Sequence, residues 1–294
     1  MAKSKYIGIV YIIAAAFCFA TMNTFVRLSG DLPFIQKSFF RNLVALFFAT
    51  IVLLKNNKKF YWKKGNLPYL LIRATFGSLG VICNFYAIDH LLLANASMLN
   101  KMSPFFAIAL CFIFLKEKVT LVQILGVAIA FIGSLFIVKP SFQNISFFPS
   151  LIGLLGGFGA GTAYTAVRVL SKRKEDGSFV VFFFSAFSCL IMLPYVLLFF
   201  KSMSLLQTLF LFAAGLSAAG GQFSITAAYY HAPASKISVY DYSQVLFAAI
   251  MGFFIFAQIP DAFSVIGYFL ICGSAIAMFF YNENLNKKLK DHVN

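Results

Sequence analysis

Long apolar stretches recur along the whole chain and limit what it can fold into. Ten stretches approach the length that crosses about 30 Å of hydrocarbon as a helix, at residues 6–27, 34–54, 67–88, 94–115, 120–138, 150–170, 179–200, 205–230, 236–256 and 263–281. Lipid cannot satisfy unpaired backbone groups, and no stretch alternates like a barrel strand, so each is expected to be an α-helix. The predicted fold class is an all-α integral membrane protein with ten transmembrane helices.

Composition supports this class and argues against others. Hydrophobic residues make up 61% of the chain and charged residues 11%, which leaves too little polar surface to cover a soluble globule. The net charge of +15 is spread over short loops rather than one soluble face, so nucleic-acid binding is not expected. The five cysteines lie inside apolar stretches without metal-ligand spacing. We expect a small-molecule substrate and a lipid bilayer as partners, with no metal, cofactor or nucleic acid.

The basic residues also predict an orientation. With a cytoplasmic N-terminus, most of them fall on the inner side, including Lys55, Lys63, Lys64, Lys116, Lys118, Lys172, Arg173 and Lys174. Fewer fall on the outer side, among them Arg27, Lys37, Arg41 and Lys201. Positively charged loops are retained in the cytoplasm. We therefore predict a multi-pass protein of a bacterial cytoplasmic membrane with both termini cytoplasmic, and Arg73, which follows a basic loop, is assigned to this topology.

The chain repeats itself. A shift of 141 residues superposes, without a gap, Thr24 on Thr165, Arg27 on Arg168, Gly80 on Gly221 and His90 on His231. Matched arginine, histidine and glycine at one register are harder to ascribe to chance than matches among abundant apolar residues. We predict two repeats, residues 1–141 and 142–294, with five helices each. An odd number of helices inverts one repeat relative to the other, and such carriers bind substrate between their repeats.

One apolar stretch carries a charge at a depth that lipid disfavours. Ala94–Lys118 is predicted to be a continuous membrane-length helix, with Asn100 and Lys101 a third of the way in. A lysine at that depth costs roughly 3 kcal/mol on insertion scales, so it usually faces a wet cavity or a partner group. Asp241, opposite Asn100 in the repeat, is the only carboxylate well inside a stretch. It is either a substrate-binding or proton-coupling group, or a structural contact between helices.

The depths of Lys101 and Asp241 argue against a direct ion pair. At about 1.5 Å per residue, straight helices would leave on the order of 10 Å between the two along the membrane normal, which a zwitterionic substrate would span. The candidate substrate-binding residues are Asn23, Arg41, Asn100, Lys101, Tyr164, Tyr240, Asp241 and Gln244. For any single tyrosine, plain helix packing is an equal alternative. Arg27, Lys37 and Arg41 together suggest an anion-attracting outer vestibule.

Small residues and prolines mark further positions. The glycines expected to let helices approach closely, with gating as a lesser role, are Gly77, Gly80, Gly157, Gly161 and Gly221. Pro104 is expected to mark a kink or a helix end.

The segment Phe85–Val138 carries a family pattern. It contains YAI, ANASM, SPFFA and FLKEKVTLVQILGVAIAFIG, and its characteristic positions are Tyr86, Ala87, Pro104, Glu117, Gln123, Gly126 and Gly133. Together with Arg41 in the second helix, this pattern resembles the ten-helix EamA type of the drug/metabolite transporter superfamily. The stretch Arg73–Pro104 is also similar to the branch that contains S-adenosylmethionine and organic-anion carriers. The resemblance covers the whole chain and implies a carrier that works by alternating access.

The expected function is secondary active transport of a small polar or zwitterionic metabolite, such as an amino acid or an S-adenosylmethionine-like compound. Transport is expected to be driven either by proton coupling through Asp241 or by exchange of solutes. Enzyme motifs and a domain for ATP hydrolysis are missing, so an enzyme is not expected. The alternatives are a lipophilic drug exporter, for which Lys101 and Asp241 would matter little, a non-transporting receptor or scaffold, and an intramembrane enzyme.

Overall fold

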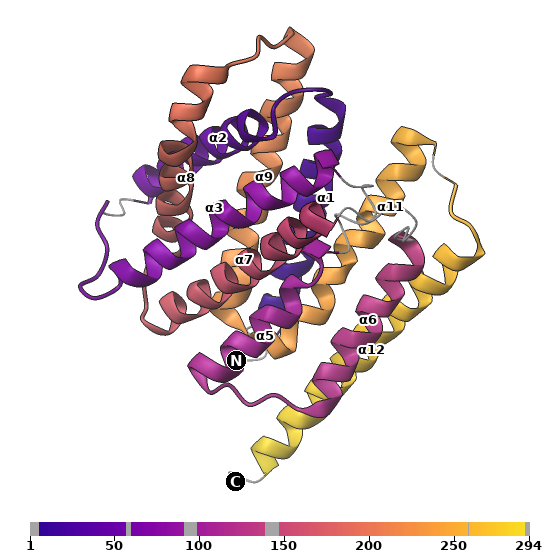
Figure 1. The fold of residues 1–294 in the computed structure, drawn as a ribbon. Helices are drawn as coiled ribbons and strands as arrows, with labels where there is room; N and C mark the ends of the chain where they lie inside the picture. The colour runs from indigo at the N-terminus through magenta and orange to yellow at the C-terminus, as the bar shows by residue number, and fades with distance from the viewer. Residues whose placement is uncertain (1–5, 57–59, 91–98, 139–146, 258, 292–294) are drawn as a thin grey trace.

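A computed structural model describes residues 6–56, 60–90, 99–138, 147–257 and 259–291 of the chain (Figure 1). The ANASM motif lies outside these ranges. All regular elements within them are helices, eight of which are long and apolar enough to cross a membrane, and two shorter apolar helices accompany them. The prediction of an all-α membrane protein with ten apolar helices is confirmed.

The helices follow the predicted stretches closely. The N-terminal half contains α1 (Ile7–Leu28), α2 (Phe34–Lys55), α3 (Leu67–His90), α5 (Ser103–Leu115) and α6 (Leu121–Val138). The C-terminal half contains α7 (Phe147–Lys172), α8 (Gly177–Phe199), α9 (Leu205–His231), α10 (Ala234–Ile237), the 3-10 helix η2 (Ser238–Tyr242), α11 (Ser243–Phe256) and α12 (Ala262–Asp291). The largest difference in length is at α12, which continues beyond the apolar stretch into a polar tail.

The polarity of the bundle is reversed relative to a soluble protein. Large apolar side chains lie on its outside, such as Phe254 with 78% of its surface exposed, while Arg41 inside is only 2% exposed. Gln36 and Asn42 are also fully buried. An apolar exterior of this extent requires lipid around it, because water would not tolerate so large a continuous apolar surface.

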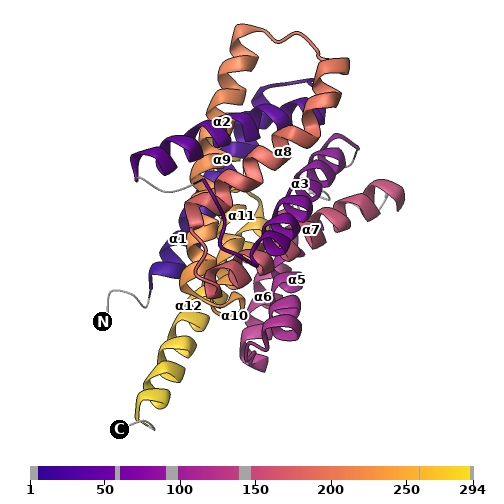
Figure 2. The same ribbon diagram turned by 90° about the vertical axis from the view of Figure 1, so that its left-hand side faces the viewer.

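The helices of the two halves pack against one another. The closest pairings are α1 with α9, α3 with α7, α6 with α12 and α2 with α8 (Figures 1 and 2). The 141-residue shift makes α1 the counterpart of α7, α2 of α8, α3 of α9 and α6 of α12. Exchanging every helix for its counterpart turns the α1–α9 pairing into the α3–α7 pairing and leaves the other two pairings as they are. The predicted repeats 1–141 and 142–294 would produce this symmetry, and the division remains a prediction.

Glycines allow close approach at several helix crossings. A Cβ atom on Gly161 of α7 would lie 2.6 Å from Cβ of Phe106 and 2.9 Å from the carbonyl oxygen of Ser103, both in α5. The other predicted glycines of this kind also face close neighbours: Gly80 faces the backbone of α7, Gly157 the carbonyl of Leu99, and Gly221 the ring of Phe19. Close packing at these positions follows directly from the geometry, and gating stays a prediction.

Polar contacts divide the loops into two sets. The backbone N–H of Lys63 and the amide of Asn66 donate to Glu175 Oε2 at 3.0 and 2.7 Å, which joins the α2–α3 loop to the α7–α8 loop. The side chain of Gln36 donates to the carbonyl of Lys201 at 2.8 Å and accepts its N–H at 2.9 Å, which joins the start of α2 to the α8–α9 loop. Because α2 and α8 each run from one set to the other, the sets lie at opposite ends of the bundle.

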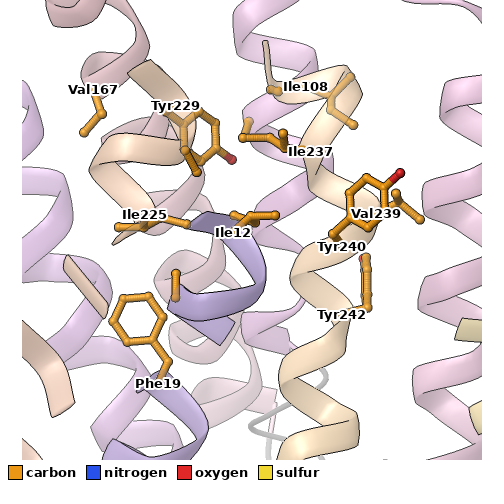
Figure 3. Close-up of a cluster of buried hydrophobic side chains, with 14 of the residues drawn as sticks. Ile12, Phe19, Ile108, Val167, Ile225, Tyr229, Ile237, Val239, Tyr240 and Tyr242 are labelled. Atoms are coloured by element: carbon orange, nitrogen blue, oxygen red, sulfur yellow. The ribbon is translucent and has the colours of Figure 1, made fainter. Parts of the chain in front are cut away.

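A hydrophobic cluster fixes the short 3-10 segment in the centre (Figure 3). Ile237, Val239 and Tyr242 are each at most 1% exposed and pack with α1 and α9 residues such as Ile12 and Ile225. This packing holds η2 rigidly from one side. Asp241, the one charged residue of η2, belongs to the wall of a cavity described below.

Candidate substrate site

Two chain segments are interrupted at the centre of the molecule. Lys101 and Met102 form a turn, and α5 starts only at Ser103, with Pro104 in its first turn. Proline has no N–H, and its ring would clash with the carbonyl four residues earlier in an unbroken helix. The continuous membrane-length helix predicted for 94–118 is therefore wrong in the described residues. In the C-terminal half, η2 interrupts the segment between α10 and α11.

These interruptions bring Lys101 and Asp241 together. Lys101 Nζ lies 3.1 Å from Asp241 Oδ2, and it also donates to Gln244 Oε1 at 2.7 Å and to the carbonyl of Asp241 at 3.3 Å. The hydroxyl of Tyr242 donates to the carbonyl of Lys101 at 3.0 Å. The expected separation of about 10 Å is wrong, because it was based on straight helices that enter from opposite faces. The turn and the 3-10 segment place both side chains at one level.

The ion pair is almost fully shielded from solvent. Lys101 is 6% exposed and Asp241 is 7% exposed. Removing two charges from water costs free energy that their mutual attraction offsets only in part, so a buried pair is weak support for a purely stabilising role. Such a pair beside a cavity is a candidate for ligand binding.

The pair forms part of the wall of a cavity of about 80 Å³. Seven of the predicted substrate-binding residues line this cavity: Asn23, Arg41, Asn100, Lys101, Tyr164, Asp241 and Gln244. They come from α1, α2, α7, α11 and the two interrupted segments. The eighth, Tyr240, is 6% exposed and lies in the hydrophobic cluster beside Val239 (Figure 3), away from the cavity wall. The roles of all eight remain predictions.

A stripe along α3 completes the wall and was missed in the sequence. Arg73, Gly77, Gly80 and Asn84 all line the cavity. Their spacing of four, three and four residues places them on one helix face. This pattern of polar and small residues within an apolar helix could have identified the stripe. Arg73 was instead assigned to topology because it follows a basic loop.

Arg73 is held in the wall by neutral groups. Its Nη2 donates to Gln222 Oε1 at 2.6 Å, and its guanidinium carbon lies 4.1 Å from the centre of the Phe184 ring. A Cβ atom on Gly77 would overlap Nη1, so this glycine provides the room that the guanidinium occupies. The Nε atom is buried and has no hydrogen-bond partner in the part of the chain that the structure describes. Arg73 therefore keeps an unused donor.

Arg41 is also buried against neutral partners. Its Nε lies 2.9 Å from the sulfur of Met22, and its Nη1 donates to Asn42 Oδ1 at 3.2 Å. Of the three residues expected to form an outer vestibule, only Arg41 lines the cavity, whereas Arg27 lies over the Phe256 ring at 4.6 Å and Lys37 lies outside the wall. The outer vestibule remains a prediction.

A second charge cluster, in which the Glu117 side chain is buried and that of Lys172 is exposed, joins the end of α5 to α7 and α9. Arg168 Nε lies 2.8 Å from Glu117 Oε1 and its Nη1 donates to the carbonyl of Tyr229 at 3.1 Å. Lys172 Nζ lies 3.1 Å from the same Glu117 oxygen. The cluster links the end of α5, which starts at the site, to helices of the C-terminal half. A search of the described residues finds no group of three or more histidine, cysteine, aspartate or glutamate side chains that could hold a metal.

Known proteins of similar sequence are named as transporters. The pseudopaline exporter CntI of Pseudomonas aeruginosa is 33% identical over 274 residues, which cover 92% of this chain and 95% of that protein. The riboflavin transporter of Brucella anthropi is 25% identical and covers 90% and 95% of the two chains. Solute carrier family 35 member G1 of Mus musculus is 28% identical, over 89% of this chain and 75% of the relative.

A solved crystal structure has the same fold, with a TM-score of 0.82 at 14% identity over 97% of this chain and 99% of the other. The model of the EamA-like transporter family matches residues 6–139 and again residues 148–280. The resemblance to the drug/metabolite transporter superfamily is thereby confirmed. Ten apolar helices, a polar cavity between them and these matches lead to one conclusion: the chain belongs to the EamA-like transporter family.

Proposed function

We propose that this transporter is a secondary active carrier that moves a small, polar, charged metabolite by alternating access. The observation that carries the proposal is the buried Lys101–Asp241 ion pair, 3.1 Å apart, in the wall of the central cavity. Carriers with interrupted helices use the freed backbone groups and helix ends at mid-membrane to bind substrate and ions. The meeting point of η2 with the Lys101 turn has these features.

The ion pair also suggests how transport is coupled. Protonation of Asp241, or a substrate ammonium group that replaces Lys101, would each open the pair without leaving the carboxylate uncompensated. Released Lys101 could in turn bind a substrate carboxylate. Proton coupling and exchange are therefore both compatible with one site, and Asp241 is the residue at which they act.

A lipophilic drug exporter has less support. Besides the Lys101–Asp241 pair, the cavity wall contains Arg41 and Arg73, and an apolar cargo would leave the charges of these two arginines without a counter-charge. The amides of Asn23, Asn84, Asn100 and Gln244 line it as well. A polar metabolite can use these donors and acceptors.

The orientation and location belong to the same proposal. We place both termini in the cytoplasm of a bacterial cell, with the loops that hold Lys63 and Arg173 on the inner side. The opposite end of the bundle, with Gln36 at the start of α2 and Lys201 in the α8–α9 loop, then faces outward.

Counterflow in proteoliposomes tests the proposal. Vesicles are loaded in turn with amino acids, nucleosides, S-adenosylmethionine, riboflavin, carboxylates or lipophilic cations, and exchange of the labelled compound is measured. A polar metabolite exchanged by the wild type and by Asp31→Asn, a control at an exposed carboxylate, but not by Asp241→Asn, would support the carrier. If lipophilic cations are the only compounds exchanged, and the wild type, Asp31→Asn and Asp241→Asn exchange them equally, the result would favour drug export. Binding without any counterflow would favour the receptor.

A further inference from the structure

The cavity wall carries more positive than negative charge. Three cationic side chains, Arg41, Arg73 and Lys101, line it together with one described carboxylate, Asp241. Lys101 and Asp241 compensate each other at 3.1 Å. Arginine stays protonated at neutral pH in proteins. Two guanidinium charges are therefore left over in the wall.

No carboxylate compensates these two guanidinium groups within the described part of the chain. The ion pairs reported above join Lys101 to Asp241 and both Arg168 and Lys172 to Glu117, and neither Arg41 nor Arg73 takes part in them. Arg41 and Arg73 are each 2% exposed and contact neutral groups. Burying a charge without a counter-charge is strongly unfavourable, so a fold retains two such charges in one cavity when a ligand supplies the opposite charge.

The geometry of Arg73 indicates an oxyanion as its ligand. Stacking on Phe184 and the room left by Gly77 fix the plane of the guanidinium, while Gln222 occupies only Nη2. The buried Nε has no partner among the described residues, so one N–H donor of the guanidinium remains for an oxygen of a carboxylate or phosphate group on a ligand. A purely structural arginine would have this donor satisfied by protein groups.

The cavity also contains an unpartnered acceptor. Asn23 Oδ1 is buried and accepts no hydrogen bond from any described residue. A hydroxyl or ammonium group on the cargo would satisfy it. The cargo that fits is therefore anionic overall and also carries a hydrogen-bond donor.

We infer that the cargo is an organic anion with at least two carboxylate or phosphate groups, one bound by Arg41 and one by Arg73, and with a hydrogen-bond donor near Asn23. This inference rests on the proposed function, because it names the class of metabolite that the carrier moves. Arg41 and Arg73 then determine specificity, and the Lys101–Asp241 pair keeps the role proposed above.

Ligand-dependent thermal unfolding of the purified protein at constant ionic strength tests the inference. Succinate, 4-aminobutyrate and 1,4-diaminobutane share one backbone length but carry two carboxylates, one carboxylate with one ammonium, and two ammonium groups. The unfolding midpoint should rise most with succinate, less with 4-aminobutyrate and not with the diamine. Glycerol 3-phosphate, a dianion with a single phosphate group, is run beside them. A shift larger than that of succinate would show that one doubly charged group is enough and would contradict the requirement for two anionic groups.

Charge-removing variants locate the effect. Arg41→Gln and Arg73→Gln should each raise the apparent Kd of the preferred anion at least tenfold, whereas Arg27→Gln, outside the cavity, should leave it unchanged. Arg41→Lys and Arg73→Lys keep the charge and lose the planar fork, so they should bind with intermediate affinity. If a glutamine variant does not fold, two results still test the inference. These are the order of the midpoint shifts that the ligands cause in the wild type, and the anion affinity of the lysine variants.

Several results would overturn the inference. These are a diamine or 4-aminobutyrate response as large as that of succinate, no response to either dianion, or unchanged anion affinity in folded Arg41→Gln and Arg73→Gln. If one of these results is found but the protein still exchanges a zwitterion in counterflow, the anion inference is wrong and the proposed carrier function stands. Stabilisation by a dianion without counterflow of any solute would support the anion site and contradict the carrier.

Discussion

At the scale of single residues, Lys101 and Asp241 should depend on each other for stability. Removing one charge of a buried pair leaves the other uncompensated and costs about 3–5 kcal/mol. We expect Lys101→Gln or Asp241→Asn alone to lower the thermal midpoint strongly, and the double variant to lose less than the sum of the two. A double-mutant cycle from unfolding curves in detergent measures this coupling.

Transport by the double variant separates the two roles left open for Asp241. If the protein that carries both Lys101→Gln and Asp241→Asn folds but no longer exchanges its cargo, the result supports a substrate or proton-coupling role. Full counterflow activity in the double variant would reduce the pair to a contact between helices.

Glu117 should contribute more to stability than an exposed carboxylate. Its Oε1 contacts Arg168 at 2.8 Å and Lys172 at 3.1 Å, and its side chain is 8% exposed. We expect Glu117→Gln to cost about 2 kcal/mol, which is typical of a charged hydrogen bond. Lys201→Gln is the control, since the exposed Lys201–Asp31 pair at 3.6 Å should contribute less than about 1 kcal/mol. Equal losses in unfolding experiments would contradict the role given to the cluster.

At the scale of elements, the α5–α7 crossing should be sensitive to a single methyl group. Gly161→Ala places a Cβ atom 2.6 Å from Phe106 Cβ, so α5 must move, and the expected cost is about 1–3 kcal/mol. Gly273→Ala in α12 is the matched control, because its added Cβ has no neighbour within 4 Å among the described residues apart from its own stretch of helix. That variant should be neutral or more stable by about 0.5–1 kcal/mol. Comparison of unfolding midpoints distinguishes the two, and a neutral Gly161→Ala would contradict the close packing.

The elements were predictable where a single physical constraint determines them. Lipid allows only paired backbone, so apolar length gave α1, α2 and α8 almost to the residue. Burying a charge in lipid is costly, so the positions of Lys101 and Asp241 within apolar stretches identified both as candidate site residues. Their direct contact was not predictable from depth along straight helices, because the break before Pro104 and the 3-10 geometry of η2 are set by tertiary packing. Arg73 had two explanations, a part in membrane topology and a place in the cavity wall. Proximity to a basic loop favoured the first, and its position in the wall became visible only in the structure.

At the scale of the whole molecule, the two sets of loops should face opposite sides of the membrane. Lys64 and Ser202 are exposed members of the two sets. With Cys18 and Cys272 replaced by serine, an impermeant maleimide should label Ser202→Cys in intact cells and Lys64→Cys only after permeabilisation. The reverse labelling would invert the orientation, and labelling of both in intact cells would contradict separate faces.

The setting of Arg73 also bears on how cargo choice can evolve in such a carrier. Its guanidinium is bonded to Gln222, stacked on Phe184 and accommodated by Gly77. A lineage that replaced the arginine alone would leave an amide oxygen without its donor and a void beside an aromatic ring. Moving to a neutral cargo therefore requires joint changes on α3, α8 and α9, and intermediate sequences with only one of them would be less fit than either end point.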